Sequence, residues 1–404
     1  MEARYLNTIE ESRISGKPLP LEIIENVQEA IWLGISSSVR AVLKRVVEMA
    51  LDDERTARLK AARHERTPER RGHRNGTYTR DLHTTLGPID DLEVPRVVMP
   101  DGTSPGEWQT FDRYERRTYE LDRLIGQLFL YGCSARNVER VSKDLWGRKV
   151  GRSTTSRVTE SFEDEAKGIN EAEIPTEIRY LFLDGQAHKV ASELGLVDKQ
   201  LLAAFAILSD GSERLLGYRL AGSESEGEWG MLLDDLKARG LRSVELIIVD
   251  GAGGLEAALA TRFANVPVQR CIMHVARNVM AKVRARNKAE VGEDLRSIWD
   301  SPDRATAMTN FEAFTTKWII SEERAVRCLA DKIDRALTFY DFPQQDWSKI
   351  RTNNVAERGF RFIRQRQRPI GAFTNEESAE RIVGALGGEW NQRRSHPLEA
   401  IYTT

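Results

Sequence analysis

Two aspartates and one glutamate stand where they could bind metal ions beside a phosphate backbone. Asp184 and Asp250 close apolar, strand-like runs, IRYLFLDG and SVELIIVDG, and a glycine follows each of them. An acid at the end of a buried strand is costly unless it is paired, hydrogen-bonded or bound to a cation. Glu357 is the one acid in the segment Arg351–Pro369, which also carries six arginines. These three acids are therefore the candidates for a catalytic site.

The segment around Glu357, RTNNVAERGFRFIRQRQRP, has the spacing of a helix. At about 3.6 residues per turn, one face carries Asn353, Glu357, Arg361, Arg364 and Arg368. A carboxylate leading a row of guanidinium groups suits a metal ion held beside a phosphate backbone. We expect the proline at position 369 to end this helix. The alternative is a solvated basic helix with one incidental acid.

The three acids can form one site only if the fold brings them together. If the strands that end at Asp184 and Asp250 are neighbours in one sheet, both carboxylates emerge at the same edge, where Glu357 can join them. Three carboxylates without His or Cys ligands favour Mg²⁺ or Mn²⁺ over zinc. Two such ions would clamp the attacking and leaving oxygens of a phosphodiester. The alternative is that both Asp-Gly pairs are only turn formers.

The sequence around these acids predicts an α/β sheet domain followed by helices. Apolar or alternating runs predict strands, and apolar residues at helical spacing predict helices. The predicted strands are 178–185, 201–208, 213–220, 243–250 and 266–271. The predicted helices are 226–239, 255–263, one from residue 272, several within 289–350, and one within 376–404.

The N-terminal half reads as helices, a hairpin and a basic loop. Residues 1–62 have helical periodicity, and such a helix either buries its apolar stripe in the domain or forms an oligomer interface. Residues 63–80 are basic and rich in turn formers, which predicts a loop that is either solvated or an arm on DNA phosphates. Residues 82–98 alternate around Gly87-Pro88 and predict a short hairpin. The candidate phosphate contacts of the basic segment are Arg66, Arg70, Arg71 and Arg74.

Residues 118–167 predict three helices with a glycine-bearing turn, the pattern of a helix-turn-helix. The last helix begins with small polar residues that suit groove edges and phosphates. The candidate DNA contacts in it are Ser153, Thr154, Thr155 and Arg157. Trihelical cores also occur in packing and dimer modules, so the pattern leaves that alternative open.

Composition excludes several classes of protein. The 404 residues carry a net charge of −2, so bulk charge does not indicate nucleic-acid binding, whereas the basic stretches 55–80, 270–288 (with Arg277) and 351–369 do. Three scattered cysteines are too few for a disulfide framework. No apolar run approaches the bilayer-spanning length, and the first residues have no signal pattern. We expect a cytoplasmic, nucleoid-associated bacterial protein without a membrane partner.

Several segments resemble the Mutator-type bacterial transposases, the insertion-sequence 256 family. VDGAGGLEAAL…VQRCIMHVARN and FPQQDWSKIRTNNVAERGFRFIR are similar to the two most diagnostic blocks of that family. ERTPERRGHRNGTYTRDL and SESEGEWGMLLDDLKARGL resemble its N-terminal and mid-domain blocks. The resemblance covers nearly the whole chain, and the order of elements is similar to the ribonuclease-H-like fold of DDE transposases and integrases.

The resemblance implies a fold and a division into domains. The fold is an α/β ribonuclease-H-like catalytic domain with an all-helical insertion, preceded by mainly helical DNA-binding and dimerisation domains that include the helix-turn-helix. The implied segments are 1–110 (dimerisation and basic arm), 111–175 (helix-turn-helix), 176–288 (first part of the catalytic core), 289–350 (helical insertion) and 351–404 (final helices with Glu357).

The resemblance also implies an activity. Asp184, Asp250 and Glu357 would be the catalytic triad and would hold two Mg²⁺ or Mn²⁺ ions, while Arg358, Arg361 and Arg364 position backbone phosphates. A homodimer would bind double-stranded DNA, both the terminal inverted repeats of its element and the target. It would cut at the element end and join the freed 3′ hydroxyl to another strand, through a copied-out circular intermediate.

Two other functions fit the same residues. A metal-dependent nuclease or resolvase of this fold would cut DNA without joining it to a target. A repressor derived from a transposase would bind DNA without catalysis.

Three further features have both a structural and a functional interpretation. Cys271 and His274 fall on the family's Cys-x-x-His signature, but zinc needs about two further ligands, so we interpret them as structural or DNA-proximal. His188 lies four residues beyond Asp184 on the same strand face and either contacts the site or is structural. Glycines follow Asp250, but no Gly-Lys-Ser/Thr motif accompanies them, so a nucleotide cofactor is not expected.

Overall fold

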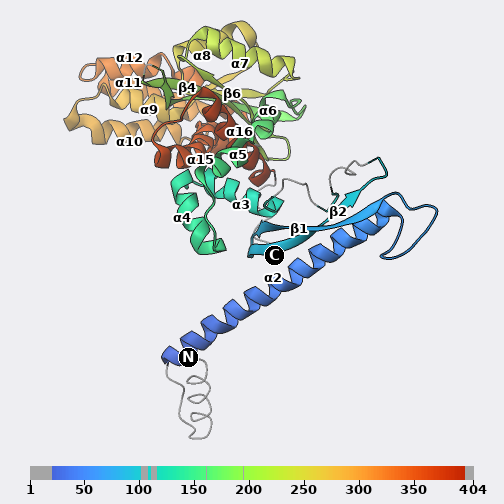
Figure 1. Cartoon of the computed structure of the whole chain (residues 1–404). Helices are drawn as coiled ribbons and strands as arrows, with labels where there is room; N and C mark the ends of the chain where they lie inside the picture. Colours follow the sequence, from blue (N-terminus) through green and yellow to red (C-terminus); the bar gives the residue numbers. More distant parts are fainter. Residues whose placement is uncertain (1–20, 102–107, 111–115, 161, 194, 396–404) are drawn as a thin grey trace. The chain divides into compact units, whose positions relative to one another are not determined.

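The computed structural model describes residues 21–101, 108–110, 116–160, 162–193 and 195–395 (Figure 1). Residues 1–20 of the predicted helical region lie outside the described residues. The chain forms two compact units: unit 1 is Met1–Leu128 with Ala135–Val158, and unit 2 is Phe129–Ser134 with Thr159–Thr404. The finer domain boundaries expected from the sequence stay predictions.

Unit 1 begins with a long helix packed on a β-hairpin. Helix α2 (Leu21–Leu59) lies along strands β1 (His73–Thr84) and β2 (Gly87–Val98), which pair antiparallel with Thr84 opposite Gly87. Their shared core consists of Leu51, Leu82, Ile89, Leu92 and Val94. The outer face of α2 leaves five apolar side chains exposed: Ile35, Val39, Val42, Val46 and Met49.

The predicted hairpin is confirmed, but the predicted loop over 63–80 is wrong from residue 73 onward. Residues 73–80 belong to β1, whose first half is mostly exposed and therefore lacks apolar alternation. The Asn75-Gly76 pair does not end the strand. The pairing register shifts between Arg74 and Thr77 instead, and Gly76 has a φ of 69°, so the two residues form an irregularity within the strand.

Helices follow where residues 118–167 predict them. They are α3 (Tyr119–Leu130), α4 (Ala135–Trp146) and α5 (Arg152–Glu160). The next helix, α6 (Phe162–Glu171), packs in unit 2 against the last described helix, α16 (Glu376–Arg393). The DNA-reading role of the three-helix segment stays a prediction.

Unit 2 is built on a mixed five-stranded sheet in the order β5-β4-β3-β6-β7. The strands are β3 (Ile178–Ser192), β4 (Gly195–Leu208), β5 (Glu213–Ala221), β6 (Leu246–Val249) and β7 (Val268–Arg270). Strands β3, β4 and β5 pair antiparallel, whereas β3–β6 and β6–β7 pair parallel. The five strands predicted from the sequence are confirmed. Strand β3, however, does not end at Asp184 but continues to Ser192, because its second half pairs with the start of β4.

Helices cover both faces of this sheet (Figure 1). One face packs against α7 (Glu226–Ala238) and α8 (Gly253–Arg262), around the fully buried Trp229. The other face packs against α15 (Asn354–Ile370) and α16, with Phe205, Phe360 and Trp390 in contact. This second core continues into the helices that precede α15.

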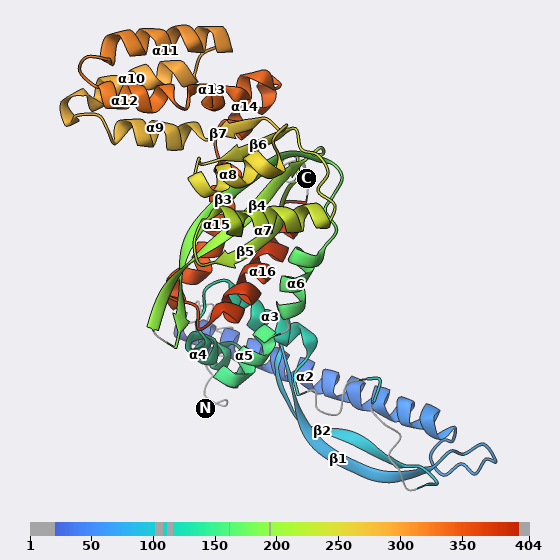
Figure 2. The ribbon, with the colours of Figure 1, turned by 90° about the horizontal axis from the view of Figure 1, so that it is seen from above.

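The segment between β7 and α15 is helical, as predicted for 289–350. It contains α9 (Ile272–Met280), α10 (Lys288–Trp299), α11 (Arg304–Trp318), α12 (Glu323–Ala330), α13 (Ile333–Ala336) and α14 (Trp347–Ile350), with short 3₁₀ turns. Figure 2 shows these helices grouped beside β7. None of the helices in the described ranges is both long and apolar enough to cross a bilayer.

The predicted end of the arginine-bearing helix is off by one residue. Helix α15 includes Pro369 and ends at Ile370, after which Gly371 takes a φ of 74°. Pro369 has no backbone N–H to donate to the carbonyl of Gln365, and the helix ends one residue after it.

Candidate functional site

Asp184 and Asp250 lie at the same place along two neighbouring parallel strands. Leu183 of β3 pairs with Val249 of β6, so the two aspartates are the next residues in register. The Asp250 carboxylate accepts a hydrogen bond from the N–H of Ala252 at 2.9 Å. The juxtaposition expected from the sequence is therefore present, although β3 itself runs on past Asp184.

The electrostatic surroundings of Asp184 consist mainly of other acids. Burial raises the pKa of its carboxyl group to about 8. The negative charge of Asp250 adds to this rise, and Glu224 and Glu357 add smaller contributions. The N–H of Gly185, which donates to Asp184 at 3.0 Å, opposes the rise in pKa. Four carboxyl groups thus share this corner of unit 2, and they come from four separate segments of the chain.

Glu357 is placed by the start of α15. Its backbone N–H donates to the carbonyl of Asn353 at 3.0 Å, which puts Glu357 in the first helical turn. Asn353 is fully buried, and its side-chain amide donates to the carbonyl of Leu183, the residue before Asp184, at 3.2 Å. The helix that carries the third acid is therefore tied directly to the strand that carries the first.

A buried cysteine makes a second connection to the start of α15. The thiol of Cys271 accepts the backbone N–H of Asn353 at 3.3 Å, and the N–H of Cys271 donates to the carbonyl of Val249 at 2.8 Å. Burial raises the pKa of this thiol, and the nearby charge of Glu357 raises it further. Cys271 therefore links the end of β6, next to Asp250, to the helix of Glu357. His274 is half-buried one turn along α9.

Glu224 is a member of this group that the sequence reasoning missed. A Cβ added to Gly185 would lie 2.7 Å from a carboxylate oxygen of Glu224, so the glycine makes room for this side chain. A Cβ on Gly254 would lie 2.1 Å from the backbone carbonyl of Glu224, so a second glycine lets the loop approach. Burial raises the pKa of Glu224, and the charge of Asp250 raises it further. The available signal was the pair of glycines, because glycine permits close approach.

The donor chemistry of the four acids fits a hard divalent cation. Within the described ranges, none of Asp184, Glu224, Asp250 and Glu357 forms an ion pair with an Arg, Lys or His side chain, so their charge is not balanced by the protein. Oxygen-only ligands are what Mg²⁺ and Mn²⁺ take. The same ranges contain no three His, Cys, Asp or Glu side chains already gathered into a metal-binding cluster. The metal site thus stays a prediction that the ligand types support.

The arginines of α15 have different surroundings. Arg358 forms an ion pair with Glu213. Arg361, about one turn beyond Glu357, is exposed. Arg364 is half-buried, and Arg366 is fully buried with its guanidinium 3.8 Å from the ring centre of Phe129. Arg361 and Arg368 are therefore the α15 arginines that are exposed to a phosphate.

His188 lies deeper than the carboxylates. It is 1% exposed, and its ring stands 5.9 Å from that of Phe373. Burial, opposed by a side-chain hydrogen bond with Gln367 and assisted by the charge of Arg364, lowers its pKa to about 4, so the ring is neutral at pH 7. These contacts belong to the core between β3 and α15.

The predicted DNA contacts outside α15 are partly exposed and partly engaged. Arg66, Arg71, Ser153, Arg157 and Arg277 are exposed, and Thr154 is half-buried. Arg70 donates to the carbonyls of Gly72 and Glu65, and Arg74 binds Asp52 and Thr56 of α2. Thr155 is fully buried. Whether any of them contacts DNA stays a prediction.

Comparison with known proteins gives one consistent result. A family model described as transposase, Mutator family, matches residues 20–393. The transposase for insertion sequence element ISRM5 of Rhizobium meliloti (strain 1021) is 30% identical over 362 residues, which is 90% of each chain. The transposase for IS406 of Burkholderia multivorans is 32% identical over 350 residues, 86% of this chain and 89% of that one. The transposase for IS256 in transposon Tn4001 of Staphylococcus aureus is 29% identical over 380 residues, 91% and 94% of the two chains.

Proposed function

The chain belongs to the Mutator family of transposases, and from this premise we propose that it cuts and joins DNA at the ends of an insertion sequence by DDE chemistry. In this proposal Asp184, Asp250 and Glu357 hold two Mg²⁺ or Mn²⁺ ions in a ribonuclease-H-like core. The sheet order, with three antiparallel strands followed by two parallel ones, supports that core.

One observation carries the proposal. Asp184 and Asp250 occupy equivalent positions on parallel neighbouring strands, and the charge of Glu357 acts on Asp184. Three acids that are far apart in the sequence therefore share one electrostatic environment. A structural role for these acids would leave unexplained why the fold buries Asp184 among like charges without a cationic partner, because such burial is costly.

The residues of the chain have separate tasks in this chemistry. Divalent ions, when bound, supply the Lewis acid that activates the attacking oxygen and stabilises the leaving one. Asp184, Asp250 and Glu357 would hold these ions beside the C-terminal end of β6. Asn353 fixes the direction from which Glu357 approaches. Arg361 binds a backbone phosphate of the DNA and so orients the scissile bond.

The reaction proceeds in two steps, a hydrolysis followed by a transesterification. Water attacks the phosphodiester at the element end and frees a 3′ hydroxyl. That hydroxyl then attacks a second phosphodiester and displaces the 3′ oxygen of the attacked strand, which joins the strands without a covalent protein–DNA intermediate. DNA synthesis by a polymerase from the displaced 3′ hydroxyl would then give the copied-out circular form. The direct test is to incubate the chain with Mg²⁺ and labelled element-end DNA and to score both nicking and joining. Nicking without joining would identify a nuclease instead.

We also propose that unit 1 binds the terminal inverted repeats and that α2 forms a homodimer with a second copy. The exposed apolar residues of α2, at positions 35, 39, 42, 46 and 49, alternate in steps of four and three and are 43–63% exposed. That spacing is the a/d repeat of a coiled coil, which is self-complementary. The opposite face of α2 already packs on the hairpin, so this stripe is available to a partner.

A further inference from the structure

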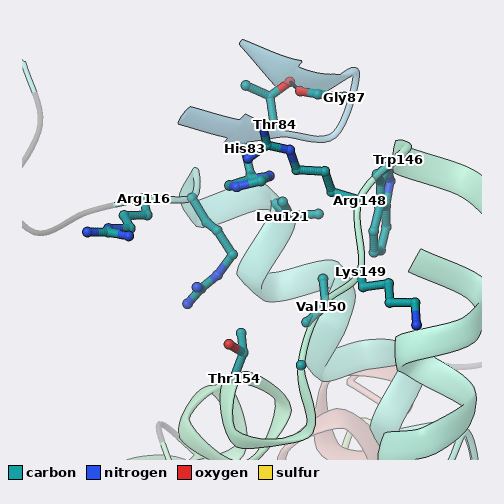
Figure 3. Close-up of a pocket in the computed structure, with 12 residues that line it drawn as sticks. His83, Thr84, Gly87, Arg116, Leu121, Trp146, Arg148, Lys149, Val150 and Thr154 are labelled. Atoms are coloured by element: carbon teal, nitrogen blue, oxygen red, sulfur yellow. Dashed lines mark hydrogen bonds between the residues drawn. The ribbon is translucent and has the colours of Figure 1, made fainter. Parts of the chain in front are cut away.

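Unit 1 contains a cavity between the turn of the β-hairpin and the helices that follow it. Its volume is about 170 Å³, and it lies among His83 and Thr84 of β1, Trp146 at the end of α4, and Thr154 in the first turn of α5 (Figure 3). At roughly 30 Å³ per water-sized group, this volume accommodates about six such groups. That is enough room for one phosphate with its ester oxygens.

The side chains around this cavity are positive. Arg116, Arg117, Arg148 and Lys149 are among the twelve residues that line it, and no acidic residue is among them. In Figure 3, Arg148 extends toward His83 and Thr84, while Arg116 and Lys149 lie at opposite edges. A cavity of this size with several cationic donors and no carboxylate attracts an anion.

Two of these cations form ion pairs with acids that do not line the cavity. Arg148 binds Asp81 at 2.9 Å and Asp90 at 2.8 Å, and these acids lie on the hairpin strands. Arg117 forms an ion pair with Asp122. These pairs fix the direction of both guanidinium groups, which reduces the entropy lost when an anion binds.

The other two cations have weaker connections. Lys149 is 3.8 Å from Glu139, and its side chain is 63% exposed. Arg116 is exposed, and its backbone carbonyl accepts the N–H of His83 at 2.9 Å. Both side chains can therefore turn toward a bound anion.

The start of helix α5 lies beside the cavity, because Gly151 and Thr154 are among its lining residues. Helix α5 begins at Arg152, and Thr154 and Thr155 already donate to the carbonyl of Gly151. The N–H groups that precede them in the first turn have no intrahelical acceptor. Val150 is fixed by its N–H, which donates to Ser142 at 2.8 Å. Helix N-termini of this kind favour phosphate.

We propose that this cavity binds one backbone phosphate of the bound DNA, with Arg116 and Lys149 closing on it. The inference rests on the proposed DNA-processing function and adds a contact that reads no bases. Because this contact is made to the DNA backbone, it would position unit 1 on a duplex of any sequence. Free phosphate shares the same chemistry, so the experiment must separate the two sources.

The test is DNA binding by the full chain carrying Asp250→Asn, measured by fluorescence anisotropy over a range of salt concentrations. Arg116→Gln with Lys149→Gln should weaken binding roughly tenfold and make the slope of log K against log salt shallower by about one, because one phosphate contact is lost. The loss should be equal for element-end and unrelated duplexes. Arg123→Gln, an exposed arginine of α3 outside the cavity, is the matched control and should leave both the affinity and the slope unchanged.

A second measurement identifies the phosphate itself. Single methylphosphonate substitutions remove the charge of one phosphate at a time. One backbone position should weaken binding several-fold in the parent chain and have no effect in the double variant. If no position behaves in this way, or if the double variant binds with the parent affinity and slope, the proposal is overturned. Stabilisation by inorganic phosphate that the double variant abolishes, without any such DNA position, would assign the cavity to a free anion and also overturn it.

Folding and function are controlled separately. Arg116→Lys with Lys149→Arg keeps both positive charges and should retain the parent affinity. If substitution at these two positions weakened binding by disturbing the fold, this variant would bind weakly as well. Failure of the proposed transposase activity would show as absent Mg²⁺-dependent cleavage by the unmodified chain, which this binding experiment does not use.

Discussion

The side-chain amide of Asn353 donates to the backbone carbonyl of Leu183 at 3.2 Å, so the helix of Glu357 starts against the strand of Asp184. Asn353 precedes α15, yet its side chain does not cap that helix. Asn375 caps the N-terminus of α16, where its side chain accepts the N–H of Ser378 at 2.8 Å. The two asparagines therefore form a natural pair for separating positioning from helix stability.

We expect Asn353→Ala to lower cleavage by at least about tenfold in folded protein, because a small shift of Glu357 misplaces the reacting groups. Loss of the buried side-chain hydrogen bond to Leu183 should also reduce the free energy of unfolding by about 1–3 kcal/mol. Asn375→Ala should cost a similar amount, about 1 kcal/mol, with cleavage per folded molecule unchanged. Cleavage rates and denaturant unfolding measured on both variants check this. Equal cleavage losses in the two would show that Asn353 acts only through stability.

Glu224 should contribute to cation binding. Glu224→Gln removes one negative charge beside Asp184 and Asp250, so we expect affinity for Mn²⁺ to fall by roughly 10–100-fold, the range seen when groups around metal ligands are lost. Isothermal titration with Mn²⁺ measures this without DNA. Glu226→Gln, an exposed acid two residues away in the first turn of α7, is the control and should leave affinity unchanged. Unchanged affinity in Glu224→Gln would remove Glu224 from the site.

The stability of the metal-free chain should depend on the protonation of Asp184. Its pKa is 3.8 when solvated and about 8 in the fold. Between these values the folded chain retains a proton that the unfolded chain has released, so stability falls as the pH rises from about 4 to 8. Asp184→Asn lacks this titration and should gain stability over the parent chain across that window when EDTA is present. Parallel unfolding curves at each pH test the prediction, and an unchanged difference from pH 4 to pH 8 would contradict it.

The α2 stripe should control the oligomeric state. Val42→Glu places a charge at the most exposed valine of the stripe, 63% exposed, and should convert a dimer to a monomer in light scattering because the buried charge would lack a partner. Ala41→Glu adds the same charge one residue away, off the stripe, and should remain dimeric. A monomeric parent chain, or a dimer that survives Val42→Glu, would show that α2 is not the interface.

Much of the sheet could be predicted because its strands are strongly apolar. The runs that end at Leu183 and Val249 are fully buried on both faces, which gives continuous hydrophobic sequence. The exposed half of β1 had no such signal, and its Asn75-Gly76 pair suggested a turn where the structure has an irregularity within the strand. Propensity rules use only local composition, whereas pairing with β2 is what makes residues 73–80 a strand.

The site could be predicted only in part, since Asp-Gly occurs in two structural settings. Asp184-Gly185 lies within β3, beside Asp250-Gly251 at the end of β6. Asp210-Gly211 instead forms the turn between β4 and β5, where Asp210 accepts the N–H of Ser212 at 2.8 Å. The preceding apolar runs look alike. Glu224 could not be identified, because it lies in a polar loop and its proximity depends on glycines in two other segments.

The most direct test of the central claim measures Mg²⁺-dependent cleavage of labelled element-end DNA. It compares substitutions of the three proposed metal ligands with a substitution in the Asp210-Gly211 turn. Asp184→Asn, Asp250→Asn and Glu357→Gln should each reduce cleavage below roughly a hundredth of the parent rate while DNA binding is retained, since a lost metal ligand costs several kcal/mol. Asp210→Asn should cleave at the parent rate. Cleavage above that level in any of the three variants would contradict the proposal that these carboxylates hold the catalytic ions.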